Sequence, residues 1–214
     1  MVKWLLKWHI LNIRLRTIQP FSHLFMHIDE AKSKLRDSIS ERLSRMSDRD
    51  RGEESGSICK RLLEMIPEDS SVCVYSALRT EPDLNKFIRA LWDRGDRVFY
   101  PFFEGDHFNF REANDFSELR PGKLKILEPP SSSPKADPQE IDFVIVPARA
   151  FDREMNRLGR GNGGYDYWIK KQRKVNLKTK MIGVAFECQI VNEVPVDVHD
   201  EKIDEVVTDR GPIV

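Results

Sequence analysis

Apolar residues spaced three or four positions apart predict two amphipathic helices in the first third of the chain. The apolar positions are Leu35, Ile39, Leu43 and Met46 in the first helix, and Ile58, Leu62 and Ile66 in the second. Ser47 stands at the expected N-cap of the second helix, where a hydroxyl can accept a hydrogen bond from a free backbone amide. Pro67 should end that helix, because proline has no amide hydrogen and clashes with the preceding turn.

Short apolar runs follow, and they alternate with further helical patterns. Buried strands are predicted at 72–75, 98–100, 141–146, 181–186 and 206–208. Pro101 and Pro147 should end two of these strands. Further helices are predicted over residues 84–91, closed by Gly95, and from a start near Tyr165. Alternating strands and helices predict an α/β layered fold around a mainly parallel sheet.

Four phenylalanines surround a predicted turn at Gly105 and Asp106, which suggests a β-hairpin. They are Phe102, Phe103, Phe108 and Phe110. Aromatic side chains at such positions either fill the core or form a surface on which a ligand stacks. The sequence alone leaves both interpretations open.

The overall composition narrows the class of protein. The chain has 214 residues, of which 40% are hydrophobic and 33% charged, so it can bury the core of one large domain. Its formal net charge of zero argues against a general nucleic-acid binder, which needs a basic excess. Three cysteines without C-x-x-C spacing suggest free thiols in a reducing compartment. No apolar run approaches the roughly 18–20 residues of a membrane helix, so no membrane partner is expected.

Residues 1–28 differ from the rest, because the first acidic residue of the chain is Asp29. Basic residues and apolar residues at helical spacing make a basic amphipathic helix possible there. One interpretation is an organelle-targeting segment. A second is a start codon assigned too early, with Met26 as the true beginning, and a third is a peripheral membrane anchor. The globular domain is accordingly predicted to span residues 29–214.

A glycine-rich loop at 156–166 is the strongest candidate for a functional site. Four glycines within six residues allow backbone amides to converge on an anion, and a following helix adds its positive end. Arg157 and Arg160 supply guanidinium groups suited to phosphate oxygens, and Asp166 supplies a carboxylate suited to Mg²⁺. The residues predict a polyphosphate site. The pattern matches no standard nucleotide fingerprint, so a solvated surface turn is the alternative.

Two other segments carry candidate site residues. Residues 76–81 leave the carboxyl end of a predicted strand, the edge at which parallel α/β sheets bind ligands. Glu81 could line such a site, or it could simply precede the next helix, where an acid is favourable. Lys32 and Arg36 lie near the start of the first helix, where positive charge opposes the helix dipole. They are therefore either solvated or directed at an anion.

Several separated stretches together resemble 5-formyltetrahydrofolate cyclo-ligase, also called methenyltetrahydrofolate synthetase. The matching segments are 32–36, 75–81, 142–147, 150–152, 157–166, 182–186 and 198–200 with Asp204. The resemblance covers residues 29 to about 208. It implies a single-domain, three-layer α/β/α sandwich around a largely parallel sheet.

The resemblance also implies an activity. The enzymes of this family cyclise 5-formyltetrahydrofolate to 5,10-methenyltetrahydrofolate with ATP and Mg²⁺, releasing ADP and phosphate. Phosphorylation of the formyl oxygen would make it a good leaving group when N10 attacks. The implied partner is a small folate substrate, with or without polyglutamylation, and the implied protein is a cytoplasmic monomer or homodimer. An organellar location follows if residues 1–28 are a targeting segment.

Site residues follow from the resemblance position by position. The matched ATP-binding positions are Lys32, Arg36, Arg157, Leu158, Gly159, Arg160, Gly161, Asn162, Gly163, Gly164 and Tyr165. Arg157 and Arg160 would also act in catalysis. Ser76 and Glu81 match folate-binding positions, and Asp166 and Asp200 match positions associated with the metal.

Two residues depart from the family pattern. Gly164 stands where the family commonly has an aromatic residue, so one ring that could hold the substrate is missing. Asn162 stands where glycine or lysine is common, so a lysine contact to phosphate is lost and Arg160 would supply more of the charge. The alternative function is therefore a folate- or nucleotide-binding relative that has lost turnover.

Overall fold

A computed structural model of the chain describes residues 27–105, 107–122 and 126–213. In these residues a seven-stranded sheet has the order β11-β10-β9-β6-β1-β2-β3. The strand bounds are Ser71–Cys73 for β1, Arg97–Glu104 for β2, His107–Glu112 for β3, Phe143–Pro147 for β6, Lys180–Val184 for β9, Glu205–Thr208 for β10 and Gly211–Pro212 for β11. The neighbours from β10 to β2 pair in parallel, and the edge strands β11 and β3 pair antiparallel. The predicted mainly parallel sheet is confirmed.

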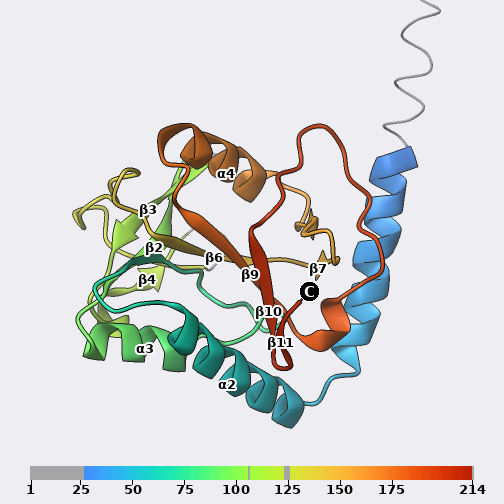
Figure 1. Cartoon of the computed structure of the whole chain (residues 1–214), viewed down its shortest axis with the longest axis horizontal. Coiled ribbons are helices and arrows are strands. Elements are labelled where there is room, and N and C mark those ends of the chain that lie inside the picture. Colours follow the sequence, from blue (N-terminus) through green and yellow to red (C-terminus); the bar gives the residue numbers. More distant parts are fainter. Residues whose placement is uncertain (1–26, 106, 123–125, 214) are drawn as a thin grey trace, which may run out of the picture.

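Helices cover both faces of this sheet (Figure 1). Helices α2 (Asp48–Met65) and α3 (Asn85–Asp93) lie on one face, and α4 (Gly164–Val175) lies on the other. Each face has its own apolar core. Leu62 and Phe87 are among the fully buried residues on the α2/α3 side, and Ile169 is buried on the α4 side. The predicted three-layer α/β/α sandwich is thus confirmed.

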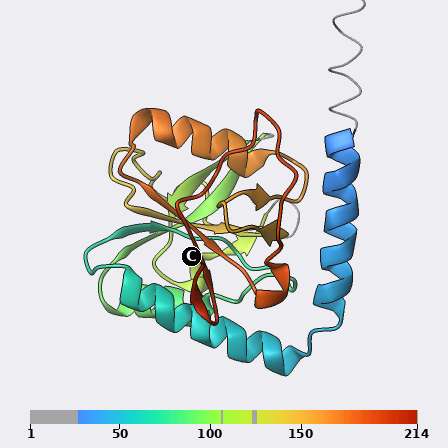
Figure 2. The ribbon, with the colours of Figure 1, turned by 45° about the vertical axis from the view of Figure 1, so that its right-hand side comes forward.

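The N-terminal helix, residues 27–44, lies along one side of the sandwich (Figures 1 and 2). Ile39 and Leu43 are fully buried and pack in a third apolar cluster with Leu158 and Phe186. Positions 32, 36, 39 and 43 share one helical face, because they are three or four residues apart. The packing of this face therefore turns Lys32 and Arg36 toward the rest of the domain. The predictions for the N-terminal segment fall on residues 1–26, which lie outside the described residues.

Several predicted element boundaries agree with the structure. The Ser47 hydroxyl accepts a hydrogen bond of 3.1 Å from the amide of Asp50, so Ser47 is the N-cap of α2. Helix α2 ends at Met65, just before Pro67. The predicted hairpin is β2–β3, which pair antiparallel up to Glu104 and His107 on either side of the turn.

The prediction that Pro101 ends a strand is wrong. Strand β2 continues through Pro101 to Glu104. Phe99 accepts a hydrogen bond from Val74 on the β1 side, and Pro101, two residues on, faces the same side. Strand β1 has already ended at Cys73. Because no strand needs the missing amide hydrogen there, proline is tolerated.

Two short strand pairs lie outside the main sheet. Strand β4 (Arg120–Pro121) pairs with β5 (Leu127–Glu128), and β7 (Ala150–Phe151) pairs antiparallel with β8 (Arg157–Leu158). The β7–β8 pair returns the chain to the end of β6, so the glycine loop starts beside the sheet edge.

The described residues also bear on two composition-based predictions. The three cysteines are free: Cys59 and Cys73 are buried and Cys188 is half-buried. Across residues 27–105, 107–122 and 126–213, no helix combines the length and hydrophobicity that crossing a membrane requires.

Gly183 in β9 provides a test of how tightly the α4 side is packed. A Cβ atom at this position would lie 2.4 Å from Cδ1 of Ile203 and 2.7 Å from Cζ of Phe151. We expect Gly183→Ala to lower the free energy of unfolding by about 1–3 kcal/mol in urea denaturation. Gly56→Ala is the matched control, because Gly56 lies inside α2 with nothing within 4 Å of its added Cβ. The control should gain about 0.5–1 kcal/mol, and equal effects of the two variants would contradict the described packing.

Candidate functional site

The candidate site lies at the carboxyl ends of the parallel strands. Three segments meet there: residues 76–81 after β1, residues 147–149 at the end of β6, and the glycine loop 156–166 after β7. Crossover connections in a parallel sheet gather such segments at one edge. The apolar strands therefore hold three irregular segments in one place.

The glycine loop takes backbone conformations that require glycine. Gly161 has a φ of +105° and Gly163, the N-cap of α4, has a φ of +63°. Gly161 lies next to the Arg36 side chain, since a Cβ at Gly161 would be in van der Waals contact with Cζ of Arg36 at 3.6 Å. The Nε of Arg36 donates a hydrogen bond of 2.9 Å to the carbonyl of Gly159. The N-terminal helix thus supports the loop from one side.

A cavity of about 550 Å³, here named the loop cavity, opens between the glycine loop and the N-terminal helix. Its lining combines cations with loop backbone and two predicted metal positions. The lining includes Lys32, Arg36, Arg157, Leu158, Gly159, Gly161, Asn162, Gly163, Asp166, Lys170, Asp197 and Asp200. The start of α4 adds its positive dipole end to this cavity. The loop cavity is therefore suited to a large anion.

Lys32 ties the N-terminal helix to the segment before β10. Its Nζ lies 2.6 Å from Asp200 and 3.0 Å from Asp197, and the side chain is 9% exposed. Burial by itself lowers the pKa of Lys32, but hydrogen bonds to Asp200 and Asp197 outweigh burial and raise it. Burial raises the pKa of Asp197, yet hydrogen bonds from the His199 amide and from Lys32 lower it overall. Both shifts favour the charged forms of Lys32 and Asp197.

Arg157 lies at the boundary between the loop cavity and a second pocket. Its Nη2 donates to Asp166 at 2.7 Å, and its side chain is 4% exposed. Its guanidinium lies 5.6 Å from the ring centre of Tyr165. The Nε of Arg157 is buried and has no hydrogen-bond partner in the described part of the chain. A buried cationic donor without an acceptor is costly, so a ligand oxygen is the natural partner.

The second pocket, here named the aromatic pocket, has a volume of about 150 Å³. Its apolar wall is formed by Tyr75, Pro101, Phe103, Phe108, Ile126 and Tyr165. Phe108 and Tyr165 lie 5.0 Å apart between ring centres. Burial raises the pKa of Tyr165, which keeps its hydroxyl protonated. Aromatic walls of this kind suit a flat ring system.

Glu81 and Arg160 close the polar end of the aromatic pocket. Nε and Nη2 of Arg160 donate to the same Glu81 oxygen at 3.0 and 2.8 Å. The other Glu81 oxygen accepts from the Leu78 amide at 3.0 Å. Glu81 is 7% exposed and turns inward, so it does more than precede α3. Ser76 lines the same pocket and accepts from the Leu127 amide at 3.3 Å.

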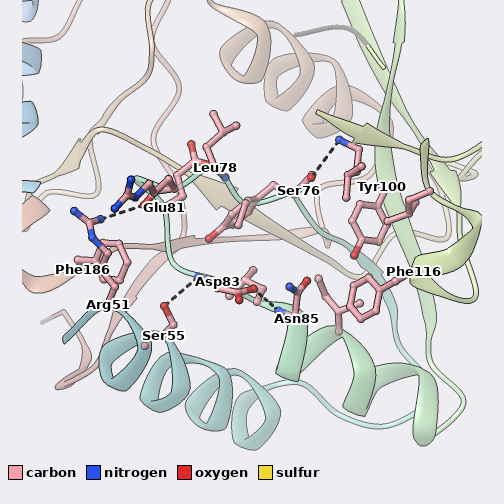
Figure 3. Close-up of a pocket in the computed structure, with 18 of the residues that line it drawn as sticks. Arg51, Ser55, Ser76, Leu78, Glu81, Asp83, Asn85, Tyr100, Phe116 and Phe186 are labelled. Atoms are coloured by element: carbon pink, nitrogen blue, oxygen red, sulfur yellow. Dashed lines mark hydrogen bonds between the residues drawn. The ribbon is translucent and has the colours of Figure 1, made fainter. Parts of the chain in front are cut away.

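A further cavity of about 390 Å³ lies on the other side of the 76–81 segment (Figure 3). Figure 3 shows Ser55 and Asp83 on one wall, and Tyr100 and Phe116 at the far end. Tyr75, Ser76, Leu78 and Glu81 line both this cavity and the aromatic pocket. The 76–81 segment therefore separates two hollows that share its side chains.

The structure brings the predicted site residues into two adjoining cavities, but it does not place them all in one. Arg160 lines the aromatic pocket and is absent from the lining of the loop cavity that contains Asp166 and Asp200. The sequence did not indicate several other residues that line the two cavities: Tyr75, Ile126, Tyr167, Lys170 and Asp197. Asp197 was detectable in principle, because it precedes Asp200 in a short polar segment. Both interpretations of the predicted hairpin phenylalanines apply to Phe108, which belongs to the apolar core and also lines the aromatic pocket.

The two departures from the family pattern also have a structural setting. A Cβ at Gly164 would lie 3.3 Å from Cε1 of Phe108. The ring of Phe108 therefore lies close to the start of α4, at the position where an aromatic side chain at residue 164 would begin. The Asn162 side-chain oxygen accepts from the Gly164 amide at 3.3 Å. Asn162 thus stabilises the loop just before α4.

The fit of a divalent metal rests on Asp166 and Asp200, which both line the loop cavity. In the described residues no group of three or more histidine, cysteine or acidic side chains is arranged to hold a metal. Mg²⁺ commonly takes only one or two carboxylates and completes its shell with water and phosphate oxygens. Two carboxylates beside an anion cavity therefore fit Mg²⁺ that arrives with a phosphate ligand.

The fold and the two adjoining cavities indicate an α/β enzyme with a hollow lined by charged groups beside a hollow lined by aromatic rings. The model of the 5-formyltetrahydrofolate cyclo-ligase family matches residues 28–209. A probable 5-formyltetrahydrofolate cyclo-ligase from Schizosaccharomyces pombe is 31% identical over 193 residues, covering 83% of this chain and 94% of its own. The Escherichia coli K12 5-formyltetrahydrofolate cyclo-ligase is 34% identical over 142 residues, covering 64% and 77%.

A solved structure agrees with these sequence matches. The Aquifex aeolicus 5,10-methenyltetrahydrofolate synthetase superposes with a TM-score of 0.72 at 28% identity, covering 85% of this chain and 91% of its own. The chain therefore belongs to the 5-formyltetrahydrofolate cyclo-ligase family. The activity of this family is the ATP-dependent cyclisation of 5-formyltetrahydrofolate to 5,10-methenyltetrahydrofolate.

The ion pairs of Lys32 give a stability prediction. We expect Lys32→Met to lower the free energy of unfolding by about 1–3 kcal/mol at pH 7, because it leaves two largely buried carboxylates without their cation. Lys34→Met is the control, since Lys34 is 74% exposed and pairs only with Glu30 on the same helix. Urea denaturation of both variants measures the difference, and equal losses would contradict the role of Lys32.

The pH dependence of this loss has a defined sign. The pKa of Asp197 is lowered in the folded chain, so its contribution is present above the ordinary value of 3.8 and is lost as the pH falls through the folded value. The difference between wild type and Lys32→Met should therefore narrow as the pH falls below 3.8.

Proposed function

We propose that this chain carries out the family reaction in its two adjoining cavities, with ATP in the loop cavity and the folate ring in the aromatic pocket. The loop cavity supports this assignment through its cations and the start of α4. The aromatic pocket supports it through the rings of Phe108 and Tyr165. The products are 5,10-methenyltetrahydrofolate, ADP and phosphate.

The observation that carries the proposal is the position of Arg157. Its side chain lines both cavities, and its buried Nε has no partner among the described residues. An oxygen of the terminal phosphate, placed where the cavities meet, would supply the missing acceptor. Arg157 would then hold the phosphoryl group beside the folate formyl oxygen, and positioning of this kind supplies much of the catalysis in phosphoryl transfer.

The chemistry divides into activation and ring closure. The formyl oxygen of the substrate takes the terminal phosphoryl group of ATP, and ADP departs. N10 then attacks the formyl carbon and gives up its proton, the C–O bond breaks so that the oxygen leaves as phosphate, and the methenyl bridge forms between N5 and N10. Negative charge builds on the transferring phosphoryl oxygens, so fixed guanidinium groups lower the barrier.

Each predicted residue has a role consistent with its position. Lys32 and Arg36 would neutralise the triphosphate from the N-terminal helix, and the backbone of 159–163 would wrap around it. Arg160 would stabilise charge on the folate side, oriented by Glu81. Glu81 and Ser76 would contact polar atoms of the folate ring. Asp166 and Asp200 would hold Mg²⁺, which neutralises phosphate charge when it is bound.

The activity is tested with purified chain, 5-formyltetrahydrofolate, ATP and Mg²⁺. We expect the absorbance of the methenyl product to rise together with ADP. Omission of ATP or of enzyme is the control, and no product above these controls would reject the proposal. Calorimetric binding of the folate without ADP formation would instead indicate a relative that has lost turnover.

The contribution of Arg160 is tested by Arg160→Lys, which keeps the charge but loses the guanidinium fork. We expect kcat to fall by about 10²-fold, because lysine cannot contact Glu81 and a phosphoryl oxygen with the same geometry. Arg45→Lys is the matched control, because Arg45 is exposed in the turn just after the N-terminal helix and pairs with Glu41. Initial rates at saturating substrate measure kcat, and comparable rates for the two variants would exclude Arg160 from catalysis.

We further propose a cytoplasmic location, supported by the three free thiols. An organellar location is the alternative if residues 1–28 act as a targeting segment. Full-length chain and a chain beginning at Met26, each with a fluorescent protein at the carboxyl terminus, distinguish the two. A cytoplasmic signal from both supports the proposal, whereas an organellar signal from the full-length chain alone supports the alternative.

A further inference from the structure

A separate cavity of about 680 Å³ lies between the N-terminal helix, α2 and the 76–81 segment. Its lining is dominated by arginines and hydroxyls. The lining residues with polar side chains are Arg36, Ser40, Ser44, Arg51, Arg79, Thr80, Arg149 and Arg160. We name it the arginine cavity. Its five guanidinium groups come from five segments of the fold, so helical repetition alone does not explain their convergence.

The protein balances only part of the positive charge in the arginine cavity within the described part of the chain. Arg160 pairs with Glu81, and Arg79 pairs with the exposed Asp48 at 3.4 Å. The other three arginines, Arg36, Arg51 and Arg149, have no carboxylate within ion-pair distance in the described part of the chain. A concave surface with excess positive charge attracts anions.

Arg149 is the least expected of these residues. It lies two residues after the end of β6 and is only 7% exposed. Its guanidinium contacts two neutral hydroxyls, Thr80 Oγ1 at 3.5 Å and Ser40 Oγ. Burial, and then the nearby charge of Arg160, lower the pKa of Arg149, whereas the negative charge of Glu81 acts in the opposite direction. Arg149 has no carboxylate within ion-pair distance in the described part of the chain, so an anion in the cavity would stabilise its buried charge.

We propose that the arginine cavity binds a phosphate dianion at a site separate from the triphosphate. Guanidinium forks match phosphate oxygens, and phosphate offers four oxygens in tetrahedral directions to donors that arrive from several sides. A carboxylate offers only two oxygens in one plane. The hydroxyls of Ser40, Ser44 and Thr80 add neutral donors around the same space.

The cavity also has a connection to the reaction. Arg36 lines both the arginine cavity and the loop cavity, and Arg160 lines both the arginine cavity and the aromatic pocket. Phosphate released where the loop cavity and the aromatic pocket meet is therefore close to two arginines that also line the arginine cavity. The identification of product phosphate as the source rests on the proposed function, whereas the binding of phosphate does not.

Calorimetry with inorganic phosphate tests the proposal. The full chain is first saturated with Mg²⁺ and a non-hydrolysable ATP analogue, which fills the loop cavity, and phosphate is then titrated without folate. We expect one phosphate per chain to bind. Arg149→Gln should weaken phosphate binding at least tenfold, because it removes the buried charge. Arg79→Glu should weaken it similarly, and this exposed substitution keeps the test valid if Arg149→Gln fails to fold.

Arg210→Gln is the matched control, since Arg210 is exposed in the turn between β10 and β11. This variant should bind phosphate with the affinity of the wild type. Absence of phosphate binding in the analogue-saturated chain would overturn the proposal, as would equal affinity in Arg79→Glu and Arg210→Gln. Binding of glutarate in preference to phosphate would also overturn it in favour of a carboxylate site. No folate turns over in these titrations, so an inactive chain that binds phosphate refutes only the proposed function.

Discussion

The structure depends on ion pairs that hold the glycine loop between segments far apart in the sequence. Arg157 with Asp166 closes the loop onto α4, Arg160 with Glu81 ties it to the segment after β1, and Lys32 with Asp200 holds the N-terminal helix alongside. Each pair is largely buried on at least one side, so each is more rigid than a surface pair. These cations are positioned before any ligand arrives, which is the condition for electrostatic catalysis without reorganisation.

The same pairs imply an exchange of partners. Asp166 and Asp200 now accept from Arg157 and Lys32, while a triphosphate with Mg²⁺ offers acceptors to the cations and a cation to the carboxylates. In the proposed function, anion and metal would therefore enter the loop cavity as a neutralising unit that offers acceptors to these cations and a cation to these carboxylates. Lys32 and Arg157 would then exchange their carboxylate partners for phosphate oxygens, and Asp166 and Asp200 would exchange their cations for the metal.

The sequence predicted the layered sheet because buried parallel strands are apolar throughout and are easily separated from helical spacing. It failed at Pro101, because whether a proline ends a strand depends on which side its nitrogen faces and on whether the neighbouring strand still extends there. It located the glycine loop and Glu81 in the site. It did not show that Arg160 would turn toward Glu81 and away from the loop cavity, or that Arg149 would join a cationic cavity. Both depend on how the N-terminal helix and the 76–81 segment dock, which no local pattern encodes.

Pro101 also has a consequence for the shape of the substrate pocket. The pairing of strands β1 and β2 ends at Cys73 and Phe99, and Tyr75 and Pro101 beyond it both line the aromatic pocket. Any other residue at position 101 would direct an amide hydrogen toward the segment that follows β1. That hydrogen would be available for a further hydrogen bond between the two backbones. Proline has no amide hydrogen, so it cannot donate a backbone hydrogen bond that would extend the pairing of β1 with β2. The aromatic pocket thus borders the place where β1 has ended while β2 continues, and Pro101 leaves no unpaired amide hydrogen there.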